Sequence, residues 1–277
     1  MRYDENRSKC RTASDTRLMA FVTLNDITLH YRFTQGRGRP IVFLNSLGTD
    51  FRIWDDVIAQ LGGQAPVLCL DKRGHGLSDD GPITMDLLVS DVAALMDHLG
   101  LKGALICGVS VGGMIAQRIA ATRPDLATGL VLCCTGAQIG DADGWNARIE
   151  AVETDGIASM SDAILERWFS KSFRTERTAE LAGYRNMLTR ISAVGYAGVC
   201  SAIRDSDLTH QSQQIAMPTH CIAGACDLAT PPALVETLAG MIPGASYQIL
   251  ENCGHLPCIE HPRAIARSIQ QMHGALT

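Results

Sequence analysis

A glycine-flanked serine restricts what this chain can fold into more than any other feature of its sequence. The motif Gly108-Val109-Ser110-Val111-Gly112 follows the apolar run Ala104–Cys107 and precedes a segment with helical spacing. So tight a strand-to-helix turn strains the backbone of its central residue, and small glycines let the chain double back. Because such a motif also occurs by chance in loops, its flanks carry the prediction. They indicate a serine hydroxyl at the carboxyl end of a strand and the Val111 N–H at a helix N-terminus.

The rest of the chain predicts the sheet to which that strand belongs. Ala20–Leu24 and Ile27–Phe33 alternate apolar and polar residues around Asn25-Asp26, which predicts a β-hairpin. The runs predicted as strands are Ile41–Leu44, Pro66–Leu70, Ala104–Cys107, Gly129–Cys134, Pro218–Ala223 and Ser246–Leu250. Helical patterns between them predict an α/β fold, with a mostly parallel central sheet and helices on both faces. Ligand sites in such folds lie at the carboxyl ends of the strands.

Between residues 138 and 207 the pattern changes from strands to helices. The segments with helical spacing are Trp145–Val152, Ser161–Phe169, Thr178–Thr189 and Val194–Ile203. Because this stretch interrupts the series of strands, we interpret it as a helical cap inserted over the strand ends. The predicted organisation is a disordered extension at 1–18, a core at 19–137, the cap at 138–207 and the rest of the core at 208–277.

Composition excludes several classes of protein. The 24 basic side chains are outnumbered by 29 acidic ones, and a formal charge of −5 argues against a nucleic-acid partner. No apolar run is long enough for a membrane helix, and residues 1–18 lack the apolar stretch of a signal peptide. We therefore expect a cytoplasmic protein, without a membrane partner, whose ten cysteines are reduced. The sequence leaves the oligomeric state open, with a homo-oligomer among the alternatives.

The cysteines do not form a metal-binding pattern. Cys253 and Cys258 flank His255, but no second pair of cysteines or histidines completes a zinc site. The sequence therefore predicts no metal and no cofactor.

A serine hydroxyl needs a neighbouring base to act as a nucleophile. Of the eight histidines, His255 follows the last predicted strand, and Asp227 follows the strand before it. The order Ser110, Asp227, His255, with each residue just past a strand, predicts a catalytic triad. Asp227 could instead cap the following helix, and His255 could be a hydrogen-bonded loop residue. Asp205 and Asp207 are weaker alternatives for the acid.

An oxyanion formed at the serine would need two N–H donors. Val111 supplies one, directly after the serine. The loop Asn45-Ser46-Leu47-Gly48 follows an early strand and predicts the backbone N–H of Leu47 as the other. His75, in a glycine-rich loop, is expected to be a structural hydrogen-bonding residue rather than a second base.

Further motifs resemble those of one family. They are Asn45-Ser46-Leu47-Gly48-Thr49-Asp50, Asp71-Lys72-Arg73-Gly74-His75-Gly76, Gly108–Gly113, Ile139-Gly140, Trp145–Ile149, Gly195–Cys200 and Arg204-Asp205. On these motifs the chain resembles the α/β-hydrolases from Ala20 to His273. Among these it resembles the 3-oxoadipate enol-lactonases of the β-ketoadipate route of aromatic degradation. The elbow and triad are typical of the whole superfamily, whereas the Asn-Ser-Leu-Gly loop and the cap motifs are typical of the lactonases. The long polar N-terminus departs from the family pattern.

The resemblance implies a hydrolase acting on a small anionic lactone, an enol-lactone with a carboxymethyl group. Trp145 and Arg148 share one helix face, and the resemblance implies that they wall the ring and bind the carboxylate. Arg148 could instead pair on the cap surface, which would leave another cation, such as Arg185, Arg190 or Arg204. The alternatives to an enol-lactonase are another small-ester or lactone hydrolase and a ligand receptor of the same fold with little turnover.

Overall fold

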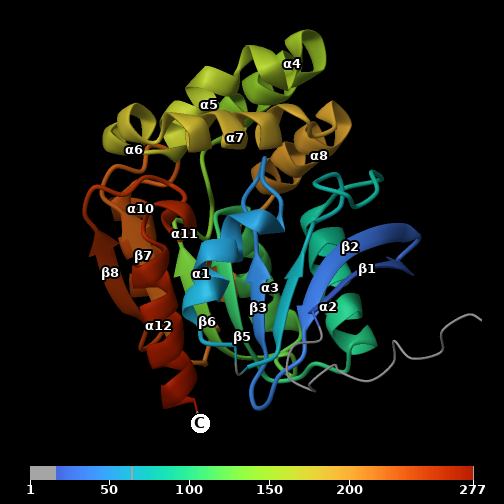
Figure 1. Ribbon diagram of the computed structural model, residues 1–277, viewed down its shortest axis with the longest axis vertical. Coiled ribbons are helices and arrows are strands. Elements are labelled where there is room, and N and C mark those ends of the chain that lie inside the picture. Colours follow the sequence, from blue (N-terminus) through green and yellow to red (C-terminus); the bar gives the residue numbers. More distant parts are fainter. Residues whose placement is uncertain (1–16, 64, 277) are drawn as a thin grey trace, which may run out of the picture.

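The computed structural model describes residues 17–63 and 65–276, and an eight-stranded sheet lies at its centre (Figure 1). The strands are β1 (Arg17–Leu24), β2 (Ile27–Thr34), β3 (Ile41–Leu44), β4 (Val67–Leu70), β5 (Ala104–Val109), β6 (Ala127–Cys133), β7 (Thr219–Gly224) and β8 (Ser246–Leu250). Their order is β1-β2-β4-β3-β5-β6-β7-β8, with β1 and β2 antiparallel and β3 to β8 parallel. The predicted, mostly parallel α/β sheet is confirmed.

The hairpin of β1 and β2 has the predicted two-residue turn. Asn25 and Asp26 have φ values of 50° and 61°, and Leu24 pairs with Ile27. Asparagine and aspartate tolerate this left-handed backbone better than most residues, which explains their place here. β1 begins at Arg17, inside the segment predicted as an extension; the rest of that prediction, residues 1–16, lies outside the described residues.

The inner strands explain the uninterrupted apolar runs. Every residue of β3, β4 and β5 is buried, because helices cover both faces of the sheet. Figure 1 shows α1 and α12 in front of the sheet, with α2 and α3 behind it. The core contains one short 3₁₀ helix, η1 (Phe51–Trp54). Its α-helices are α1 (Asp55–Gln60), α2 (Met85–His98), α3 (Val111–Thr122), α9 (Thr209–Gln213), α10 (Pro232–Met241), α11 (Pro257–Glu260) and α12 (Pro262–Ala275). None of the described helices has the length and apolarity that spanning a bilayer requires.

Five helices lie over the carboxyl ends of the strands, between β6 and β7 in the chain (Figure 1). They are α4 (Ala142–Ser159), α5 (Ser161–Trp168), α6 (Lys171–Glu176), α7 (Thr178–Thr189) and α8 (Ala193–Arg204). They fall within the segment interpreted as a cap, although α4 begins three residues before Trp145 and α6 was not predicted. Gly195 of α8 fits closely on the core, since a Cβ there would lie 2.2 Å from the Gly74 carbonyl oxygen.

Candidate active site

Ser110 lies on a strained turn between β5 and α3. Its φ and ψ are 57° and −123°, and its N–H donates to the Cys133 carbonyl oxygen at 3.0 Å. The flanking glycines are required by space: a Cβ on Gly108 would lie 2.3 Å from the Gly112 oxygen. A Cβ on Gly112 would lie 2.1 Å from the Leu44 oxygen. The neighbouring strands therefore hold the serine in a conformation that it would not adopt alone.

Asp227 and His255 meet just beyond the carboxyl ends of β7 and β8. The Nδ1 of His255 lies 2.9 Å from Oδ2 of Asp227, and both side chains are buried. The same oxygen accepts from the Thr230 hydroxyl at 2.6 Å, while Oδ1 accepts from the amides of Ala229 and Thr230. Burial raises the pKa of Asp227, but His255 and Thr230 outweigh it, so that this pKa lies below its ordinary value. The carboxylate is therefore available to orient the imidazole in its Nδ1–H form.

The two weaker candidates for the acid lie elsewhere. Asp205 forms an ion pair with Arg204, and Asp207 accepts from the Thr209 amide. Asp227 is also not the N-cap residue of α10, because that position is occupied by Pro231. Asp227 instead closes the turn before that helix while it contacts His255.

Ser110 and His255 line one cavity of about 220 Å³. The hydroxyl of Ser110 makes no hydrogen bond with another described residue, so it can rotate toward the imidazole when a ligand enters. Hydrogen bonds between nucleophile and base are often long before substrate binds. The cavity thus joins a serine on a strained turn to a histidine that an aspartate already orients.

The loop after β3 forms one wall of this cavity through Ser46 and Leu47. Within the described ranges, the Leu47 N–H donates to no acceptor. The Val111 N–H lies in the first turn of α3, where a helix has no internal acceptor for it, so both amides are free to bind a ligand. The next amide, Gly48 N–H, donates to Nε2 of His75 at 3.0 Å. Burial and the nearby Lys72 hold the pKa of His75 well below its usual range, so the ring stays neutral and accepts. His75 therefore has the structural hydrogen bond expected for it.

The cap contributes the opposite wall of the cavity, including Trp145 and Arg148. The indole N–H donates to the Ile139 carbonyl oxygen at 2.6 Å, which fixes the ring, and the Arg148 guanidinium lies 5.3 Å from the ring centre. Arg148 lies beside the buried Tyr196, and it forms no ion pair with a described carboxylate. Both residues thus lie where a ligand would meet them.

The sequence analysis missed a second cation in this cavity. Arg167 of α5 also lines it, and it too has no ion pair among residues 17–63 and 65–276. Burial and the charge of Arg148 lower its pKa, as expected when two like charges share a cavity. The helical spacing of Ile164, Arg167 and Trp168, all of which line the cavity, is the signal that could have found it. The predicted alternatives Arg185, Arg190 and Arg204 are not among the lining residues; Arg185 pairs with Asp162, and Arg204 pairs with Asp205.

One group of described residues could offer three metal ligands within 4.8 Å of one another, namely Cys134, Asp227 and His255. Asp227 and His255 are already hydrogen-bonded to each other. Burial raises the pKa of the Cys134 thiol well above its ordinary value, whereas a metal ligand must be a thiolate. The donor set suits the acid and base of a triad better than a resident metal.

Known proteins share both the sequence and the architecture of this chain. The sequence profile of the alpha/beta hydrolase family matches residues 41–268. The chain is 34% identical over 252 residues to 3-oxoadipate enol-lactonase 2 of Acinetobacter baylyi, covering 90% of this chain and 94% of that one. The crystal structure of the enol-lactonase from Burkholderia xenovorans LB400 matches with a TM-score of 0.88 and 35% identity, covering 91% and 99%. Est816, described as an N-acyl homoserine lactone degrading enzyme, matches with a TM-score of 0.81 and 26% identity, also covering 91% and 99%.

Proposed function

The chain belongs to the alpha/beta hydrolase family, and from this premise we propose that it opens 3-oxoadipate enol-lactone to 3-oxoadipate as a cytoplasmic serine hydrolase. The observation that carries the proposal is the cavity itself, which joins Ser110 and the Asp227-bound His255 to two arginines that form no ion pair within the described residues. The likeness to two enol-lactonases supports the substrate.

The residues at the cavity can perform each step of lactone opening. Ser110 attacks the ring carbonyl while Nε2 of His255 takes the serine proton, and Asp227 stabilises the imidazolium that forms. The amides of Leu47 and Val111 hold the oxyanion of the tetrahedral intermediate. When this intermediate collapses, the bond from carbonyl carbon to ring oxygen breaks, and His255 protonates the leaving enol.

The acyl-enzyme then reacts with water. The leaving enol remains tethered to the acyl group, and its conversion to a ketone removes the nucleophile that could close the ring again. His255 takes a proton from water, hydroxide adds to the ester carbon, and the Ser110 oxygen leaves with the proton. The product carries two carboxylates and the enzyme returns to its starting state.

The substrate's carboxylate requires a local cation, because a chain with a net charge of −5 repels an anion at long range. Arg148 and Arg167 both line the cavity. A guanidinium can bind a carboxylate through two parallel hydrogen bonds. We assign this contact to Arg148, with Trp145 as the wall beside the lactone ring.

Another lactone or small-ester hydrolase is the second candidate, and the likeness to Est816 favours it. A receptor with little turnover is the third. Loss of enol-lactone absorbance, compared with hydrolysis of a neutral aryl ester, separates these candidates. The proposal expects rapid multiple turnover and a clear preference for the enol-lactone, whereas a general esterase would prefer neither substrate and a receptor would stop after one turnover.

The Ser110→Ala variant tests the chemistry directly. We expect kcat for the enol-lactone to fall by roughly 10³-fold or more with the fold unchanged, as when a triad member is removed. Ser159→Ala, on the exposed end of α4, is the matched control and should retain wild-type kcat. Near-wild-type turnover by Ser110→Ala, with a circular dichroism spectrum like that of the wild type, would contradict a serine mechanism.

A further inference from the structure

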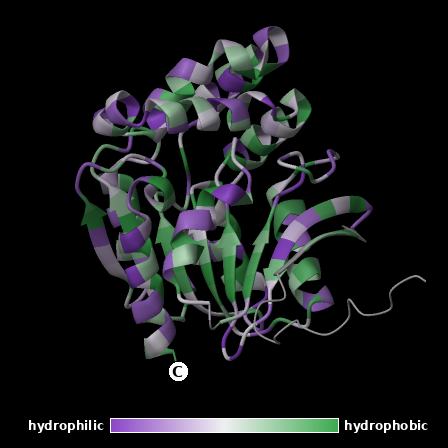
Figure 2. Ribbon diagram, in the orientation of Figure 1, coloured by the Kyte–Doolittle hydropathy of each residue, from purple (hydrophilic) through white to green (hydrophobic). Residues whose placement is uncertain are grey.

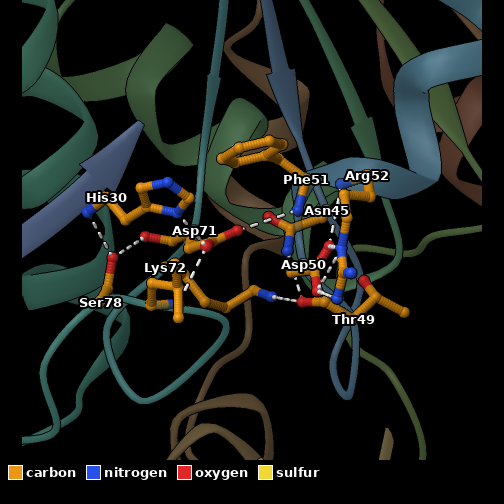
Figure 3. A network of polar contacts seen from close by, with 10 residues as sticks. His30, Asn45, Thr49, Asp50, Phe51, Arg52, Asp71, Lys72 and Ser78 are labelled. Atoms are coloured by element: carbon orange, nitrogen blue, oxygen red, sulfur yellow. Dashed lines mark hydrogen bonds and ion pairs between the residues drawn. The ribbon is translucent and has the colours of Figure 1, made fainter. Parts of the chain in front are cut away.

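A buried lysine lies beneath the loop that carries the Leu47 amide. Lys72 is only 4% exposed, and its Nζ donates to the Ser46 carbonyl oxygen at 2.6 Å, with the Thr49 carbonyl oxygen 3.4 Å away. Figure 3 shows the side chain reaching from the segment after β4 to the loop after β3. Lys72 is not among the residues that line the cavity, so it does not meet the substrate.

The carbonyl that Lys72 binds belongs to the same peptide group as the Leu47 N–H. A trans peptide is planar, and its C=O and N–H point in opposite directions. Because Lys72 holds the Ser46 carbonyl toward the protein interior, the Leu47 N–H must point the other way. Ser46 and Leu47 line the cavity together with Ser110.

We propose that Lys72 is a positioning residue of the oxyanion hole, which fixes the Ser46–Leu47 peptide and strengthens the Leu47 N–H as a donor. This inference rests on the proposed function, because only a hydrolase needs that oxyanion hole. A charge at the carbonyl oxygen polarises the whole peptide group, and such polarisation strengthens the hydrogen bond given by its N–H. A donor that is held in place before the reaction stabilises the oxyanion without reorganisation.

The neighbouring carboxylates have other partners, so the lysine is not explained as half of an ion pair. Asp71 accepts from His30 at 2.8 Å and from the amides of Phe51 and Leu77, and Asp50 pairs with Arg52 (Figure 3). Lys72 forms no ion pair within the described part of the chain.

Burial of the Lys72 ammonium lowers the free energy of unfolding. Burial also lowers the pKa of Lys72 to about 7, although the charges of Asp71 and Asp50 act to raise this pKa. Burying an unpaired ammonium disfavours folding, whereas an apolar side chain of similar length would fill the same space without that cost. The loop carbonyl is the strongest contact that offsets the cost, which points to a role in holding this loop.

Substitution of Lys72 by methionine tests the proposal, because it keeps the length of the side chain and removes the donor. We expect kcat to fall about ten- to a hundredfold, somewhat less than when an oxyanion donor is itself removed, while KM stays within about twofold. Affinity for a trifluoromethyl ketone, which forms a tetrahedral adduct with the serine, should fall by the same factor as kcat. A purely structural role would not link these two quantities.

Thr49→Val provides a second variant in case Lys72→Met does not fold. The Thr49 hydroxyl donates to the same Ser46 carbonyl oxygen at 2.9 Å, and valine has nearly the same shape. We expect a smaller fall in kcat, again with KM unchanged, and non-additive effects when both substitutions are combined. Arg52→Met is the matched control: it also removes a cation near this loop, but one whose guanidinium binds the Asp50 carboxylate, and it should leave kcat within about twofold.

Two results would overturn the inference. If the wild type is an active hydrolase, Ser110→Ala is inactive, and folded Lys72→Met or Thr49→Val keeps wild-type kcat, only the role of Lys72 is wrong. If the wild type neither hydrolyses the lactone or an aryl ester nor reacts with a fluorophosphonate at Ser110, the proposed function fails and the inference fails with it.

Discussion

The loops at the strand ends and the cap helices above them hold their side chains in different ways. Ser110, Asp227 and His255 are 6%, 3% and 2% exposed, and buried hydrogen bonds from several strands fix the loops that carry them. In the cap, ion pairs such as Arg185–Asp162 lie at the surface, where each contributes little. Figure 2 shows that the inner strands of the sheet are apolar, whereas the helices above them have mixed hydropathy. The residues that we propose to react are thus fixed by the core, whereas those that we propose to meet the rest of a ligand come from the cap.

The two regions meet at several points, and one of them lies at His255. The His255 N–H donates to the carbonyl oxygen of Trp168, at the end of α5, at 2.8 Å. Arg167, the residue before Trp168, lines the cavity. The loop that carries His255 and the cap helix that carries Arg167 are therefore directly connected beside the cavity.

Breaking the acid–base pair should have the largest effect in this comparison. We expect Asp227→Asn to lower kcat by roughly 10²- to 10⁴-fold, with a smaller change in KM, because the imidazole loses its orientation and the charge that stabilises its protonated form. Steady-state kinetics on the enol-lactone measures this. Since the pKa of Asp227 lies below its ordinary value, the carboxylate stays ionised in mild acid. Loss of activity in mild acid should therefore not arise from protonation of Asp227.

Asp205→Asn and Asp207→Asn serve as controls for this prediction. Both residues are exposed, and their carboxylates bind Arg204 and the Thr209 amide rather than His255. Either variant should retain kcat within about twofold, as surface substitutions usually do. If Asp205→Asn or Asp207→Asn loses most of its activity while Asp227→Asn remains active, the acid of the triad is wrongly assigned.

Removing a cap cation should have a smaller and more selective effect. We expect Arg148→Ala to lower kcat/KM for the carboxylated enol-lactone about ten- to a hundredfold, the loss of one charge-assisted contact. A neutral ester of similar size should be nearly unaffected, because it never used the arginine. Arg148→Lys should recover only part of the activity, since an ammonium lacks the planar fork of a guanidinium. The ratio of kcat/KM for the two substrates is the quantity to measure.

Arg167→Ala is the companion variant that distinguishes the two cations in the cavity. If Arg148 binds the carboxylate, Arg167→Ala should change the substrate ratio less than Arg148→Ala does. The reverse order would assign the carboxylate to Arg167. An unchanged ratio in both variants would remove the electrostatic basis for a carboxylated substrate.

The sequence predicted the strands and the order of Ser110, Asp227 and His255 because both depend on local pattern and on position along the chain. Apolar runs such as Ile41–Leu44 have the same bounds in the structure. The roles of these three residues, of Leu47 and Val111, and of Trp145 and Arg148 remain proposals, although the structure places them around one end of the sheet.

Contacts between separate loops could not be predicted in the same way. His30 pairs with Asp71, which is 41 residues away, and no local pattern in the sequence links the two residues. The hydrogen bond from Lys72 to the Ser46 carbonyl likewise joins loops that follow different strands. The short helices α6, α9 and α11 were also missed, because a helix of four to six residues has too few turns to show a period.

The same glycine-to-alanine change in the two regions should give opposite and modest changes in stability. Gly183 lies in the middle of α7, exposed, and a Cβ there meets no atom within 4 Å. Alanine restricts the unfolded chain and favours a helix, so Gly183→Ala should raise the free energy of unfolding by about 0.5–1 kcal/mol with no change in kcat. At Gly112 of the serine turn, the added Cβ would lie 2.1 Å from the Leu44 oxygen, and overpacking should lower the free energy of unfolding by about 1–3 kcal/mol. Urea denaturation of both variants measures the difference, and a destabilised Gly183→Ala would show that the cap is packed as tightly as the core.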